Sequence, residues 1–128
     1  MTGWDREYLA NKDEYLELFD SVMQKEQETN VEFLEKNLAE ITNRKYAVTC
    51  NSGTDALAYS LMSMGIRPGD EVITSNFSWI STASCISMVG ATPVFCDIDL
   101  NSYHLSYNSV KRMISDKTKA IVYPHLFG

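Results

Sequence analysis

From residue 46 onward, short runs of β-forming residues alternate with longer helical patterns. Strands are predicted where Val, Ile, Tyr and Phe cluster between Gly, Pro and Asp, and helices where apolar residues recur every three or four positions. The predicted strands are 46–50, 71–74, 93–97 and 120–123, and the helices are 54–64, 79–89 and one from Ser106. Because parallel strands need long crossover connections, this alternation predicts an α/β fold with a mostly parallel sheet and covering helices.

The first 44 residues have a different pattern, with two amphipathic helices and no strand. Apolar residues at helical spacing mark the first helix (Tyr15, Leu18, Phe19, Val22, Met23) and the second (Val31, Leu34, Leu38, Ile41). We therefore divide the chain into an N-terminal helical segment, 1–44, and the first part of an α/β domain, 45–128. Helix 54–64 is apolar on nearly every side, which predicts that it is deeply buried.

The charge of the chain limits its partners. Eleven basic against seventeen acidic residues give a net charge of −6, which argues against nucleic acid or an anionic membrane as the main partner. No apolar stretch is long enough to span a bilayer, and the N-terminus has no signal-peptide pattern, so we expect a cytoplasmic protein. The three cysteines, Cys50, Cys85 and Cys96, lie in apolar contexts and are predicted to be buried free thiols.

The turn Asn51-Ser52-Gly53-Thr54 joins a predicted strand to a predicted helix. A helix N-terminus leaves backbone N–H groups unpaired and carries a partial positive charge, and glycine lets a ligand approach the backbone closely. The turn therefore fits a phosphate site. The alternative is an ordinary helix cap, which Ser and Thr also form. The sequence contains neither the G-x-x-x-x-G-K-[ST] nor the G-x-G-x-x-G nucleotide motif.

Four sequence blocks, in order, resemble the DegT/DnrJ/EryC1/StrS family of pyridoxal-phosphate-dependent sugar aminotransferases. Each block is weak alone, and the four together are specific; they span roughly residues 30–128. The blocks are KYAV at 45–48 with NSGTDAL at 51–57; GI-x-PGDEVI at 65–73; FSW at 77–79 and TA at 82–83 with GATPVF-x-DID at 90–99; and TKAI at 118–121 with HLFG at 125–128.

The resemblance implies the N-terminal portion of the large domain of a fold-type I enzyme that binds pyridoxal 5′-phosphate. Thr54, with Ser52 and the backbone around Gly53 and Asp55, would hold the cofactor phosphate. The Asp55 carboxylate should point away from that phosphate, because the two would repel. Trp79 falls where the family places an aromatic ring that stacks on the cofactor; otherwise it is a core or interface residue.

The resemblance also implies what the complete enzyme does. It would transfer an amino group from an amino acid, glutamate, to a nucleotide-linked keto sugar, and it would be a homodimer. A dehydratase of the same family and a non-catalytic remnant or interaction domain are the alternatives. No lysine here matches the family's Schiff-base lysine, which we expect beyond Gly128, so the chain looks truncated and by itself should be inactive.

The remaining polar residues have simpler interpretations than catalysis or metal binding. His104 is predicted to be a solvated loop residue, and His125 to form local hydrogen bonds at a strand end. Asp97 and Asp99 resemble a strand-end turn, so no metal site is predicted.

Overall fold

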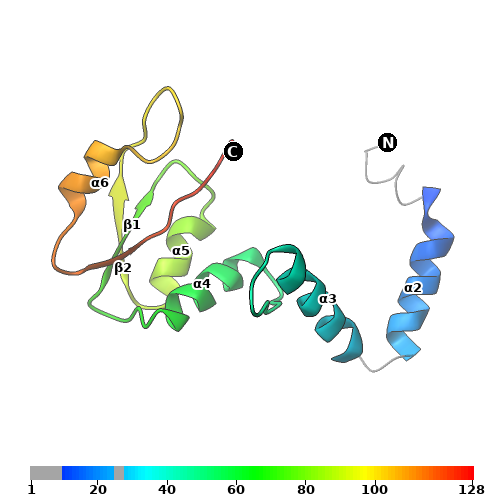
Figure 1. The fold of residues 1–128 in the computed structure, drawn as a ribbon. Coiled ribbons are helices and arrows are strands. Elements are labelled where there is room, and N and C mark those ends of the chain that lie inside the picture. Colours follow the sequence, from blue (N-terminus) through cyan, green and yellow to red (C-terminus); the bar gives the residue numbers. More distant parts are fainter. Residues whose placement is uncertain (1–9, 25–27) are drawn as a thin grey trace. The chain divides into compact units, whose positions relative to one another are not determined.

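The computed structural model describes residues 10–24 and 28–128, and the chain divides into two compact units, Met1–Thr49 and Cys50–Gly128 (Figure 1). The division lies slightly later than the boundary at 44/45 that we placed from the sequence. Residues 45–49 stay with the helical unit because the Glu35 carboxylate accepts hydrogen bonds from the Thr49 amide, at 2.7 Å, and from its hydroxyl, at 3.0 Å.

The N-terminal unit contains the helices α2 (Lys12–Gln24) and α3 (Glu28–Ile41). The predicted strand 46–50 does not form, and this prediction is wrong for the chain as it stands. A β-forming sequence becomes a strand only when a neighbour accepts and donates its backbone hydrogen bonds. No strand among the described residues pairs with 46–50, and Tyr46 and Val48 remain 73% and 85% exposed.

The second unit confirms the α/β class with a three-stranded parallel sheet. The strands lie in the order β2-β1-β3, so β1 is central and is parallel to both neighbours. The elements are α4 (Gly53–Ser63), β1 (Glu71–Ser75), α5 (Ser81–Met88), β2 (Thr92–Cys96), α6 (Tyr107–Met113) and β3 (Thr118–Ile121). Each of the three strands lies within a few residues of its predicted position.

Successive residues of β1 point to opposite faces of the sheet, and each face has its own core. Val72 packs on one face with α4 and α5, through side chains that include Leu61 and Ile86. Ile73 packs on the other face with Cys96 and Leu105, where Val110 of α6 completes the cluster (Figure 1). The central strand is therefore covered on both faces, as expected in a parallel sheet.

Helix α4 is less buried than its composition predicts. Ala58 and Leu61 are its buried residues, whereas Tyr59 and Met62 are 56% and 59% exposed. The expectation of deep burial is wrong for these residues, because only the face toward α5 and the sheet is covered.

The three cysteines are free thiols, and their burial differs. Cys50 is exposed, which corrects the prediction that all three are buried. Cys85 and Cys96 are buried, and that burial raises the pKa of both thiols. Their neutral form is therefore favoured at neutral pH, as befits packing residues.

Among the described residues, no helix combines the length and the apolarity that crossing a bilayer requires.

Two glycines with left-handed backbone allow a test of a close contact at the start of the sheet. Gly90 (φ +80°) lies against Pro68, and a Cβ on it would fall 2.7 Å from the Pro68 Cγ. Gly65 (φ +77°) has the same left-handed backbone conformation, but a Cβ there would meet nothing within 4 Å.

We expect Gly90→Ala to lower the free energy of unfolding more than Gly65→Ala. Gly65→Ala should cost about 1–2 kcal/mol, the cost of a left-handed L-residue. Gly90→Ala adds a steric clash with Pro68 to that cost. Urea unfolding of the two variants and the parent measures the difference, and equal losses would show that the contact with Pro68 contributes nothing.

Candidate functional site

The carboxyl ends of the three strands lie at one edge of the sheet, because the strands are parallel. The segments 76–80, 97–106 and 122–128 follow these ends. Ligands of open parallel sheets bind outside the carboxyl ends of the strands. This carboxyl edge is therefore where a site is expected, and α5 begins directly after the first of its segments (Figure 1).

The predicted phosphate turn forms the start of α4, with Ser52 as its N-cap. The Ser52 hydroxyl oxygen accepts the Asp55 amide at 3.1 Å and donates its proton to the Asp55 carboxylate at 2.8 Å. The Ser52 carbonyl accepts the Ala56 amide at 3.0 Å. The Ser52 side chain thus satisfies the Asp55 amide and ties the Asp55 carboxylate to Ser52, and the Ala56 bond is the first regular bond of the helix.

Two backbone donors at this helix start are left over. An α-helix does not pair its first four amides. With Asp55 capped by Ser52, the amides of Gly53 and Thr54 have no acceptor among the residues that the structure describes. A Cβ on Gly53 would meet nothing within 4 Å, so protein packing does not require glycine there. The bare backbone and its two donors fit an anion such as a phosphate.

The Thr54 side chain connects the turn to α5. Its hydroxyl donates to the Ser81 hydroxyl oxygen at 2.8 Å, across 27 positions of sequence. Ser81 is the first residue of α5, and Trp79 precedes it by two residues, which span at most about 7 Å of chain. The Trp79 carbonyl accepts the Thr82 amide at 3.0 Å, which fixes the Trp79 backbone to the first turn of α5. The Trp79 side chain is 74% exposed.

Aromatic rings gather around the same edge. Tyr103 stacks on Phe77, with ring centroids 5.8 Å apart, and meets Phe127 edge-on at 5.7 Å. His104 contacts both Tyr123 and His125, with centroids at 5.8 and 5.7 Å. These contacts join the segments that follow all three strands.

His104 is half-buried rather than solvated, which corrects the sequence interpretation. Its Nε2 lies 3.3 Å from the Gly128 carbonyl oxygen, and its ring contacts those of Tyr123 and His125. The pattern of residues in this loop gave no sign of these contacts, because they join residues about twenty positions apart.

Asp99 organises the loop after β2. Its carboxylate accepts the Asn101 and Ser102 amides, both at 3.0 Å, and the Ser102 hydroxyl at 3.2 Å. The Ser102 amide, followed by the Asn101 amide, lowers the pKa of Asp99. The strand-end turn predicted for this acidic residue is present, and in the described part of the chain no three His, Cys, Asp or Glu residues gather as metal ligands would.

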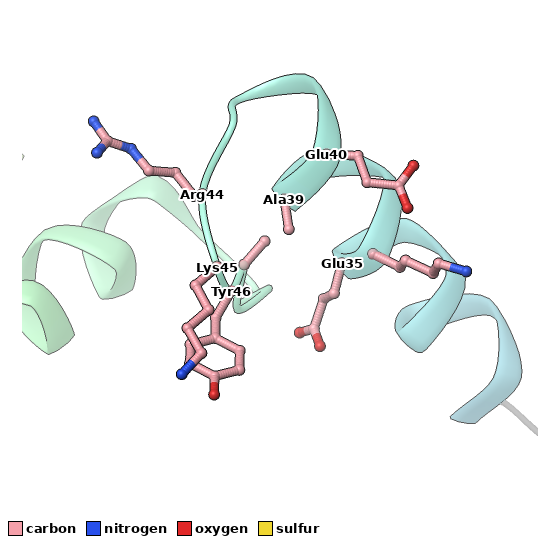
Figure 2. A pocket seen from close by; sticks show the side chains of 8 residues that line it. Glu35, Ala39, Glu40, Arg44, Lys45 and Tyr46 are labelled. Carbon is pink, nitrogen blue, oxygen red and sulfur yellow. The ribbon is translucent and has the colours of Figure 1, made fainter.

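A separate hollow of about 390 Å³ lies in the N-terminal unit, between α3 and the segment after it. Its wall carries both acidic and basic groups, and Figure 2 shows Glu40 and Arg44 extending in different directions. The carboxylate of Glu35, in the same wall, already accepts a hydrogen bond from the Thr49 amide. The hollow therefore has no set of like donors converging on one point, in contrast to the start of α4.

Comparison with known proteins identifies the family of the chain. Residues 10–128 match the profile of the DegT/DnrJ/EryC1/StrS aminotransferase family. The chain belongs to this family. It is 42% identical over 95 residues to UDP-2-acetamido-2-deoxy-3-oxo-D-glucuronate aminotransferase of Pseudomonas aeruginosa. That match covers 74% of the chain and 26% of the relative.

Solved structures share the fold. S. venezuelae DesV, in complex with a ketimine intermediate, is 29% identical with a TM-score of 0.85, over 97% of this chain and 34% of that one. NtdA of Bacillus subtilis, with the bound cofactor PMP, is 28% identical with a TM-score of 0.79, over 91% of this chain and 28% of that one. The fold is thus that of the fold-type I aminotransferases, and the chain spans about a quarter to a third of these proteins.

The site contains one contact that the sequence did not indicate. Ser52, Gly53, Thr54 and Asp55 lie together as predicted from their adjacency, whereas Ser81 was not singled out. The sequence signal that could have indicated Ser81 is its position, two residues after Trp79 at the start of a helix.

The lowered pKa of Asp99 is directly measurable. Because the folded-state pKa is depressed, the stabilisation by its hydrogen bonds is present above the unfolded pKa and is lost as pH falls through the folded one. An NMR titration should give Asp99 a midpoint below the ordinary 3.8. Ser102→Ala, which removes one hydroxyl donor and keeps both amides, should raise that midpoint only partly. A parent midpoint at or above 3.8 would contradict the loop geometry.

Proposed function

We propose that this chain forms the cofactor-binding start of a pyridoxal-phosphate-dependent aminotransferase acting on a nucleotide-linked keto sugar. The observation that carries the proposal is the start of α4. There two free amides and an unshielded Gly53 backbone lie next to the carboxyl edge of the sheet. Family membership supports the same function.

In this proposal the amides of Gly53 and Thr54 donate to the cofactor phosphate. The helix dipole adds a partial positive charge at the same point. The Asp55 carboxylate accepts the Ser52 hydroxyl at 2.8 Å and is held on the cap. The net charge of −6 is no obstacle, since these donors are local and belong to the backbone.

Trp79 is proposed to cover the cofactor ring. Its high exposure leaves an aromatic face available at the carboxyl edge, on the segment that Thr82 and Ser81 connect to the phosphate turn. A flat indole orients a flat ring and keeps water from one of its faces.

Pyridoxal phosphate, when bound, supplies the electron sink for amino-group transfer. The residues of this chain would bind its phosphate, orient its ring and exclude water. Proton transfer needs a base near the reacting carbon, and we place the Schiff-base lysine in sequence beyond Gly128. Lys119, within β3, donates its Nζ to the Asp116 carbonyl at 3.2 Å.

The substrates proposed are a nucleotide-linked keto sugar as acceptor and glutamate as amino donor. Support comes from the Pseudomonas aeruginosa relative, which by its name acts on a UDP-linked 3-oxo sugar acid. A homodimer in the cytoplasm, with no membrane or nucleic-acid partner, completes the proposal.

The test of the function is an assay of the full-length protein. Purified protein with pyridoxal phosphate, glutamate and a panel of UDP- and GDP-linked keto sugars should form an amino sugar and 2-oxoglutarate in equal amounts. Loss of a sugar hydroxyl without amino transfer would indicate a dehydratase instead. Failure to bind the cofactor at all would support a non-catalytic interaction domain.

Thr54→Ala in the full-length protein should weaken cofactor binding by about 1–3 kcal/mol, the scale of a hydrogen bond to a charged group. Spectroscopic titration with pyridoxal phosphate gives the dissociation constant. The matched control is Ser60→Ala in the same helix, whose hydroxyl bonds to the Ala56 carbonyl at 2.7 Å and should not affect binding. An unchanged constant for Thr54→Ala would exclude the Thr54 hydroxyl from the phosphate site, because the variant keeps the Thr54 amide.

A further inference from the structure

The Thr54 hydroxyl donates to a residue of another helix, unlike three serine hydroxyls that donate within their own helices. Ser60 and Ser63 of α4 donate to carbonyls of their own helix, at 2.7 and 2.8 Å. Ser21 in α2 does the same. Thr54 stands at the second position of α4, where no helical carbonyl lies a turn behind it, and its hydroxyl reaches instead to Ser81 of another helix.

Ser81 has no evident role in stabilising its own helix. The N-cap of α5 is Ile80, which makes no side-chain cap hydrogen bond. The hydroxyls near the start of α5 that do pair with each other are those of Ser78 and Thr82, at 2.8 Å. Alanine is a better helix former than serine, so helix propensity does not favour Ser81. Its contact with Thr54 is what distinguishes it.

The hydroxyl pair retains one unused proton. Two hydroxyl groups carry two protons, and one of these joins the Thr54 and Ser81 oxygens. The other has no acceptor among the residues that the structure describes, and it is available to a third group. If Thr54 turns its proton toward a ligand, its oxygen can accept from Ser81 in return. The pair can therefore present one directed O–H donor beside the free amides of the turn without breaking the link between α4 and α5.

We propose that Ser81 is a positioning residue: by donating to the Thr54 oxygen when a ligand is bound, it holds that oxygen in place and leaves the Thr54 proton directed at the cofactor phosphate. This rests on the proposed function, because it assumes that the turn binds a phosphate. Ser81 also connects the two ends of the cofactor site, since Thr54 would bind the phosphate and Trp79, two residues before Ser81, would cover the ring.

The test measures binding of two probes by the full-length protein: pyridoxal phosphate, and pyridoxal, which lacks the phosphate. We expect Ser81→Ala to weaken binding of pyridoxal phosphate about three- to tenfold, the worth of one hydrogen bond, and to leave pyridoxal binding unchanged. Ser81→Thr keeps the hydroxyl and should restore most of the affinity. The control is Ser87→Ala, at the exposed far end of the same helix.

A double-mutant cycle with Thr54→Ala separates a positioning role from an independent one. If Ser81 acts through Thr54, the double variant should bind pyridoxal phosphate no more weakly than Thr54→Ala alone. Losses that multiply would overturn the proposal, and so would an unchanged affinity of Ser81→Ala. Equal weakening of both probes would assign Ser81 a structural role and overturn it too.

The same measurements distinguish this inference from the proposed function. Parent protein that does not bind pyridoxal phosphate overturns both. Parent protein that binds it, with Thr54→Ala weakened and Ser81→Ala not, overturns only the role of Ser81.

Discussion

The burial of β1 on both faces is the constraint on which the rest of the α/β unit depends. Val72 and Ile73 are fully buried, on opposite sides, and each begins a separate core. A strand covered in this way must give all its backbone hydrogen bonds to neighbours, which here are β2 and β3, both parallel to it. Because all three strands run in one direction, the segments after them converge on one edge of the sheet. The starts of α4 and α5 and the aromatic residues lie near that edge.

The parts of the fold that depend on residues close together in the sequence could be predicted. The three strands of the sheet and the helices between them follow from runs of β-formers and from helical spacing. The turn at Ser52 to Asp55 is contiguous in sequence, so its cap could be expected as well. The resemblance to the family rests on motifs of the same local kind.

The failures concern what a segment meets in space. Residues 46–50 have strand composition, but pairing depends on a neighbour that their own sequence does not specify. The apolar residues around α4 predict burial on every side, but Tyr59 is 56% exposed, so the described part of the chain covers only part of the helix. The link from Thr54 to Ser81 joins residues 27 positions apart, and the contacts of His104 reach Tyr123 and His125. No periodic pattern encodes such contacts.

The contact between Pro68 and Gly90 has a consequence for the alignment of the strands. The two residues belong to the turns that precede β1 and β2, and the Thr92 amide bonds to the Asp70 carbonyl at 2.9 Å just after them. The pairing of Glu71 with Thr92 then continues to Ser75 with Cys96. A slip of one residue would exchange the two faces of a strand. The contact of the Pro68 ring with the Gly90 backbone fixes the register at the amino end of β1 and β2. It therefore also sets which residues of the two strands lie side by side at the carboxyl end.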